Sequence, residues 1–246
     1  MRPPANENRT TASAGYDRVM LQSPEDEFAG TAEDGVDAGV LQRLSGVGRL
    51  GVQNTSGTSR VRELYQEGAC RLRLPAPAPG APLEAVTINT GGGLTGGDRL
   101  QLAVALEAEA EAVVTSQACE KIYRSAGGEA RIESSIDLCP QSKLDWLAQP
   151  MIVFDRARIR RTLTVNMAGD ARLLAVDGII LGRTAMEEEV AAGSIHDCLR
   201  IRRDGRLVLA DAFRAGPDIA DELETPAALF KKRAVSAIIY LSLIHI

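Results

Sequence analysis

The chain has 246 residues, of which 45% are hydrophobic and 25% charged, with a formal net charge of −5. This is ordinary soluble globular composition, and the length allows one sizeable core or two modest ones. The sequence lacks the concentrated Lys and Arg excess of a nucleic-acid surface, a signal peptide and a membrane-spanning apolar run. We therefore expect a cytoplasmic protein without nucleic-acid or membrane partners.

Residues 1–40 carry eight acidic residues against three arginines and few large apolar side chains. Such a segment buries too little surface to offset the entropy of ordering, so we expect a disordered acidic extension. A β domain is predicted over residues 41–240, interrupted from Leu74 to Pro82 by the exposed loop "LPAPAPGAP".

The segment "LQLAVALEAEAEAVV" is rich in helix-forming residues, but its large apolar side chains recur at every second position: Leu100, Leu102, Val104 and Leu106. On a strand these share one face, whereas on a helix they fall on opposing sides. Alternation also predicts strands in "ARIESSIDL", "RIRRTLTVNM" and "CLRIRRDGRLVLADAF", the last with a hairpin turn at Asp204-Gly205.

Two short helices are expected, one in "AMEEEVAAG" and one in "TPAALFKKRAVSA", where Thr225 would cap and Pro226 would take the first helical position. The predicted fold class is mostly β, a stacked or helical β-sheet, sandwich-like single domain with few short helices. The cysteines form no C-x-x-C pair and are predicted to be reduced, partly buried thiols, although a metal role for one stays open: Cys70, Cys119, Cys139 and Cys198.

The stretch "TINTGGGLTGGDRL" satisfies the dinucleotide-binding pattern G-x-G-x-x-G at Gly91, Gly93 and Gly96. That pattern requires a helix to begin inside the loop, and here a predicted strand follows. A P-loop is excluded because Gly97 and Asp98 stand where Lys and Ser or Thr are needed. We favour a glycine turn between strands, with a nucleotide-dependent oxidoreductase using the Gly91–Gly97 loop as the alternative.

Three further groups of polar residues are candidate functional sites. Ser194, His196 and Asp197 in "SIHD" lack the strained turn and oxyanion hole of a hydrolase. Carboxylates near the ends of apolar runs could pass a divalent ion weakly from site to site: Asp98, Glu120, Asp155, Asp177, Glu187, Asp197 and Asp211. The polar side chains of "TSQACEKIYRS" indicate either a solvated loop or a recognition surface: Gln117, Glu120, Lys121, Tyr123 and Arg124.

Five motifs occur in order: "NTGGGLTGGDRL", "TSQACEKIYRS", "WLAQPMIVFDRARIRR", "GRTAM" and "RIRRDGRLVLADAF". Together they resemble the urease accessory protein UreD family, called UreH in some bacteria. The resemblance runs from about Gln42 to Phe213. It implies a non-enzymatic, largely β scaffold that binds the urease apoprotein and recruits UreF and the nickel-carrying GTPase UreG.

In this family the complex inserts two nickel ions into a carbamylated-lysine site, and a polar interior is thought to guide nickel. By position, the resemblance implies Asp98, Glu120, Asp177 and Asp211 as acids lining that route, with nickel bound only transiently and no tightly bound cofactor. From their residue types, Gln117, Lys121, Tyr123 and Arg124 are expected to form an interface. Pro150 replaces an acidic residue common in the family, so no ligand role is expected there.

The last six residues, "LSLIHI", match the translation of a sequencing-library adaptor, and we expect residues 241–246 to be an artefact. The family normally continues further, so the expectation is a truncated reading. The apolar run "AVSAIIYLSLIHI" would then leave an exposed strand edge, and the chain is expected to aggregate or to need its partners. A generic β-sandwich binding module remains a further alternative function.

Overall fold

The computed structural model describes residues 42–76, 80–183, 186, 188–226, 228–230 and 232–242. The predicted extension over residues 1–40 and the last four residues of the chain lie outside these ranges. Gln42–Ile246 forms one compact unit.

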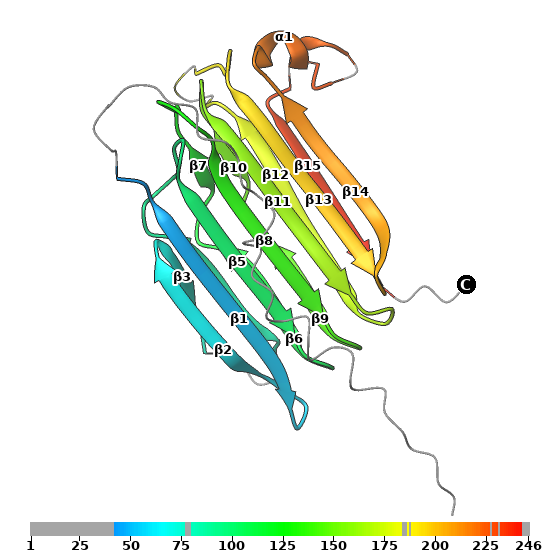
Figure 1. Cartoon of the computed structure of the whole chain (residues 1–246). Helices are drawn as coiled ribbons and strands as arrows, with labels where there is room; N and C mark the ends of the chain where they lie inside the picture. The colour runs from blue at the N-terminus through cyan, green and yellow to red at the C-terminus, as the bar shows by residue number, and fades with distance from the viewer. Residues whose placement is uncertain are drawn as a thin grey trace, which may run out of the picture. The chain divides into compact units, whose positions relative to one another are not determined.

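Two β-sheets make up this unit (Figure 1). The first, here called sheet A, has the strand order β14-β13-β11-β8-β5-β1-β2, with bounds β1 (Ser45–Thr55), β2 (Thr58–Gly68), β5 (Arg99–Leu106), β8 (Ala130–Leu138), β11 (Arg158–Met167), β13 (Ser194–Arg203) and β14 (Arg206–Ala215). The second, sheet B, has the order β3-β4-β6-β9-β12-β10-β7, and β15 also pairs with β12. Its bounds are β3 (Cys70–Arg73), β4 (Leu83–Asn89), β6 (Glu111–Ser116), β7 (Glu120–Ile122), β9 (Lys143–Leu147), β10 (Met151–Val153), β12 (Arg172–Leu181) and β15 (Ala234–Leu241).

From β4 to β13 the chain passes repeatedly from one sheet to the other, so that neighbouring strands within each sheet run parallel. In Figure 1 sheet A faces the viewer and sheet B lies behind it. This arrangement confirms the predicted mostly β, helical-sheet fold. The predicted hairpin is also confirmed, because Asp204 and Gly205 have φ angles of 49° and 76° between β13 and β14.

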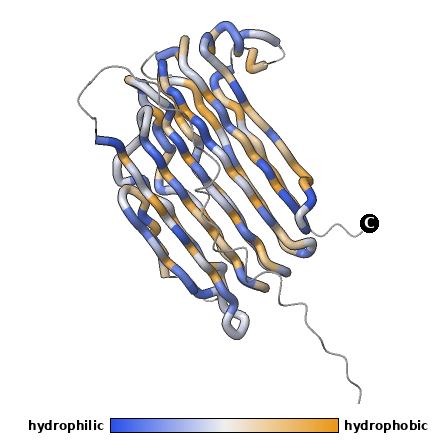
Figure 2. The backbone as a smooth tube through the Cα atoms, viewed as in Figure 1, coloured by the Kyte–Doolittle hydropathy of each residue, from blue (hydrophilic) through white to orange (hydrophobic). Residues whose placement is uncertain are grey.

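Every second side chain of these strands points into the space between the sheets. Figure 2 shows the corresponding alternation of hydrophobic and hydrophilic residues along the strands. The buried residues form two apolar clusters. On β11, Leu163 and Val165 belong to one cluster and Ile159 to the other; on β12, Ala175 and Ile179 are divided in the same way. The inward position that separates the two clusters is occupied by a charged residue on each of these strands, Arg161 on β11 and Asp177 on β12.

The run predicted as one strand from Leu100 to Val114 is two strands, β5 and β6. Glu109, with a φ of 59°, lies in the turn that carries the chain from sheet A to sheet B. Residues on the predicted apolar parity, Val104 and Ala112 among them, are buried in the same core cluster. The predicted apolar periodicity of this run is therefore confirmed, whereas the turn at Glu109 was not predicted.

The helix predicted in "TPAALFKKRAVSA" is wrong. The α-helix in the described part of the chain is α1 (Ile219–Glu224), and Thr225 ends it in an extended conformation. From Ala234 the chain forms β15, antiparallel to β12, because Val235, Ile239 and Leu241 share one face of the strand and pack against the core. In the other predicted helix Ala185 and Glu187 lie outside the described residues, and 188–193 has no helical structure.

Strand β15 has one edge paired with β12 and, within the described residues, no strand on its other edge. Ile238 and Tyr240 are 75% and 58% exposed. The strand carries no charged residue, so it lacks the usual protection of an edge strand. This agrees with the exposed apolar edge expected from the sequence.

Candidate functional site

The glycine stretch forms a tight connection between β4 and β5. Gly92 and Gly97 have φ angles of 74° and 90°, which side-chain-bearing residues rarely adopt. A Cβ atom on Gly96 would lie 2.3 Å from the carbonyl oxygen of Gly127. Because strand β5 follows, the loop offers no helix N-terminus to a pyrophosphate, and the glycine-turn interpretation is confirmed.

Asp98 closes this loop. Its side chain is buried, Oδ1 accepts a hydrogen bond from the Leu44 backbone N–H at 2.8 Å, and Oδ2 accepts one from the Thr95 N–H, also at 2.8 Å. Both oxygens are thus used to fix the entry of β1 and the exit of the glycine loop. Asp98 lies apart from the other three predicted route residues and lines neither of the cavities described below.

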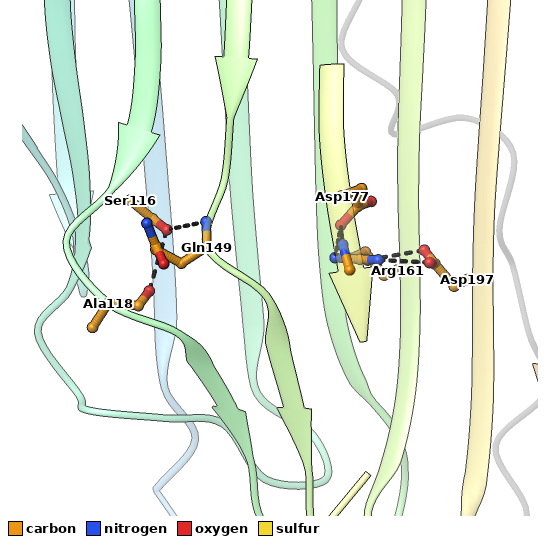
Figure 3. Close-up of polar contacts among 7 residues, drawn as sticks. Ser116, Ala118, Gln149, Arg161, Asp177 and Asp197 are labelled. Carbon is orange, nitrogen blue, oxygen red and sulfur yellow. Dashed lines mark hydrogen bonds and ion pairs between the residues drawn. The ribbon is translucent and has the colours of Figure 1, made fainter. Parts of the chain in front are cut away.

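The charged layer between the apolar clusters is built around Arg161 of β11, which points into the space between the sheets (Figure 3). Its Nε and Nη2 donate to Asp197 of β13 at 2.9 and 2.6 Å, a two-pronged contact within sheet A. Its Nη1 lies 2.7 Å from Oδ1 of Asp177 on β12, across in sheet B. The three side chains are only 13–20% exposed. We call these residues the charged triad.

Burial and charge act in opposite directions within the triad. Burial raises the pKa of the Asp177 carboxyl and so does the neighbouring Asp197 carboxylate, while Arg161 and the Gly178 backbone N–H lower it without cancelling the rise. For Arg161, burial would lower the pKa, but hydrogen bonding to Asp197 and attraction to Asp177 raise it overall. The guanidinium therefore stays charged, and the two carboxylates depend on it.

Two cavities adjoin the triad, and Arg161 and Asp177 line both. The first has a volume of about 130 Å³ and is also lined by Glu120, Asn89 and Cys70. The second, of about 110 Å³, is lined by Asp197 and Asp211 as well. Asp211 is an exposed residue of the outer strand β14. Three of the four predicted route residues, Glu120, Asp177 and Asp211, thus line two cavities that share Arg161 and Asp177 in their walls.

Glu120 is the first residue of β7 and lines the first cavity. Burial raises the pKa of its carboxyl, against the opposing effect of the Asn89 side chain, whose Nδ2 donates to Oε1 at 2.9 Å. Burial likewise raises the pKa of the Cys70 thiol in the same cavity wall. All four cysteines are free thiols, as predicted.

The four residues predicted for an interface are all exposed: Gln117, Lys121, Tyr123 and Arg124. Tyr123 lies over the glycine loop and packs against Phe154 with ring centroids 5.2 Å apart. The backbone N–H of Gln149 donates a hydrogen bond to Ser116 Oγ at 2.9 Å (Figure 3). This contact joins the start of the "TSQACEKIYRS" segment to the connection before β10.

The hydrolase interpretation of "SIHD" fails on geometry. His196 and Asp197 are consecutive residues of β13 and point to opposite faces of sheet A, Asp197 toward the triad and His196 outward. Within the ranges that the structure describes, no group of three or more His, Cys, Asp or Glu side chains is arranged to hold a metal ion. Nor does any helix in those ranges have the length and hydropathy to cross a membrane.

Sequence reasoning missed Arg161. The signal was present, because Arg161 occupies the same parity as Ile159, Leu163 and Val165, all buried in the core. A charged residue on the apolar parity of a strand faces the interior and requires a partner there.

Comparison with known proteins gives one consistent answer. Residues 45–243 match the family model described as UreD urease accessory protein. The chain is 49% identical over 190 residues to the urease accessory protein UreD of Brucella suis, covering 77% of this chain and 68% of that protein. It is 44% identical over 203 residues to the UreD of Mesorhizobium japonicum, covering 82% and 72%. The chain belongs to the UreD urease accessory protein family.

Proposed function

We propose that the chain is a urease-maturation scaffold that binds the urease apoprotein and the partners UreF and UreG and helps deliver nickel to the urease active site. The observation that carries the nickel step is the series of carboxylates along two adjoining cavities, from Glu120 through the triad to Asp211. Carboxylate oxygens bind divalent ions weakly when few of them converge, which suits a cargo that must be released.

Asp98 is not part of this proposed route, because backbone N–H groups already occupy both of its oxygens. The exposed interface residues support docking of a protein partner at the "EKIYR" end of the unit, where Tyr and Arg are suitable anchors.

The test replaces Glu120→Gln and Asp211→Asn together, which keeps side-chain shape and removes two charges. Urease would be co-expressed with its accessory proteins, and its nickel content and activity measured after purification. We expect both to fall while a pull-down still recovers the urease complex. Glu84→Gln, at an exposed position outside both cavities, is the control. Normal nickel loading in the double variant would exclude the route.

The alternatives are separated by binding measurements. A generic binding module would retain neither urease nor UreF in the pull-down. Calorimetric titration with NAD and ATP addresses the oxidoreductase alternative, for which micromolar binding, about −8 kcal/mol, would be required.

A further inference from the structure

The outward face of sheet A carries a row of basic side chains that the interior site does not use. Five neighbouring strands each contribute one basic residue, and the strand register pairs each of these residues with the one on the adjacent strand. We call them the basic row: Arg99, Arg131, Arg160, His196 and Arg214. Neighbouring strands lie about 4.8 Å apart, so the row extends for about 19 Å across the sheet. It lies near the N-terminal ends of the parallel strands, the upper end of sheet A in Figure 1.

The alternation along each strand shows that the row faces outward. Ile159 and Ile195, next to Arg160 and His196, are fully buried between the sheets. Arg99 and Arg214 are classed as exposed, whereas Arg131 is partly exposed. The side chains of the row therefore point away from the triad and its cavities.

Little within the unit neutralises this charge. Glu129 pairs with Arg160 at 3.1 Å. Elsewhere in the row, no described carboxylate lies within ion-pair distance of Arg99, Arg131 or Arg214. Arg160 Nη1 instead donates to Nδ1 of His196, which must then be unprotonated. Burial lowers the pKa of His196, and the positive charges of Arg160 and Arg214 lower it further.

Like charges directly opposite one another destabilise a sheet. Arg99, Arg131 and Arg160 stand opposite one another on three neighbouring strands, so their charges oppose folding, and an external anion that bridges these arginines would remove that cost. Arg guanidinium groups also bind carboxylates in a favourable planar geometry.

We propose that the basic row docks an acidic polypeptide segment of a partner protein, lying across the strands of sheet A. On β8 the row holds a single basic residue, Arg131. Toward the C-terminal end of β8, the next outward-facing residue after Arg131 is Glu133, whose carboxylate accepts a hydrogen bond from the Gln101 side chain. A narrow acidic peptide fits this stripe, whereas a nucleic acid would bring phosphates against Glu133. The proposal is independent of the nickel route.

The test compares two triple variants of the full chain that lose the same charge. One replaces Arg99, Arg131 and Arg214 with Gln, leaving the Arg160 contacts intact. The other replaces the exposed arginines Arg60, Arg73 and Arg206, which lie outside the row. Binding of a fluorescent polyglutamate peptide of about ten residues is followed by anisotropy at low ionic strength, where charge interactions are least screened.

We expect the row variant to weaken peptide binding by about tenfold and the control variant by less than about twofold. Thermal melting of the row variant should show no loss of stability, since its like-charge contacts are relieved. A thymidine oligonucleotide of equal charge and inorganic phosphate complete the set of probes. Equal weakening by both variants, tighter binding of the oligonucleotide than of the peptide, or no peptide binding by the unaltered chain would each overturn the proposal.

Discussion

Replacing Arg161 with Met tests whether the charged triad is held together as the structure indicates. The substitution keeps most of the side-chain volume but leaves Asp177 and Asp197 facing each other without a cation. Removing one partner of a buried ion pair costs about 3–5 kcal/mol. Because these side chains are 13–20% exposed, we expect the lower end, about 3 kcal/mol. For a unit of this size the melting temperature would fall by about 6–12 °C.

Urea denaturation and thermal melting at neutral pH measure this loss. The control is the triple variant Arg161→Met, Asp177→Asn, Asp197→Asn, which removes the carboxylates as well and should recover most of the stability. Without Arg161, the pKa of Asp177 rises further above its ordinary value of 3.8. The native state then holds protons that the unfolded state releases, so stability falls as pH rises and the defect shrinks toward acid pH. A loss below about 1 kcal/mol, or no recovery in the triple variant, would refute the reasoning.

Three other substitutions have defined outcomes. Gly96→Ala should cost about 3 kcal/mol because its Cβ would overlap the Gly127 carbonyl oxygen, whereas Gly127→Ala, with open space around it, should be near neutral in the same denaturation assay. Asp98→Ala should cost about 2 kcal/mol by orphaning two backbone N–H groups, and an unchanged melting temperature would contradict that role. Glu120→Gln should raise the melting temperature at neutral pH, because burial raises the pKa of this carboxyl; the gain should vanish as pH falls below its ordinary value of 4.5, and a gain independent of pH would count against burial as the cause.

The alternation of apolar residues in the sequence predicted most of the strands. Every second residue of β5 is apolar, as is every second residue of β11 except Arg161, and these apolar residues are the ones that pack between the sheets. Composition was a poorer guide. Ala, Leu and Lys in "TPAALFKKRAVSA" favoured a helix, but Val235, Ile239 and Leu241 share one face of β15, and pairing with β12 outweighed the local preference.

The same periodicity contains the charged triad, although the partners could not be read from it. Arg161, Asp177 and Asp197 each fall on the apolar parity of their own strand. Which of these side chains meet depends on the pairing of β11 with β13 and on the packing of β11 against β12 of the other sheet. Residues that contact each other in the triad are separated by up to 36 positions in sequence. Nothing local encodes that register, so Asp177 could be nominated and its cation could not. Asp98 was nominated for its carboxylate, but the backbone groups that occupy it became visible only with the loop in place.

The balance of charge along the two cavities bears on what they can admit. Their walls carry one guanidinium, that of Arg161, and four carboxylates: Glu120, Asp177, Asp197 and Asp211. Within the triad the two aspartates share a single cation, so even the most buried part retains a negative charge when all its groups are ionised. Such an interior attracts cations and repels anions, and the raised pKa of Glu120 and Asp177 means that protons compete with a cation for these carboxylates. On the proposed nickel route, cation uptake should therefore weaken as pH falls, and Glu120→Gln should flatten that dependence by removing one of the groups that takes up a proton.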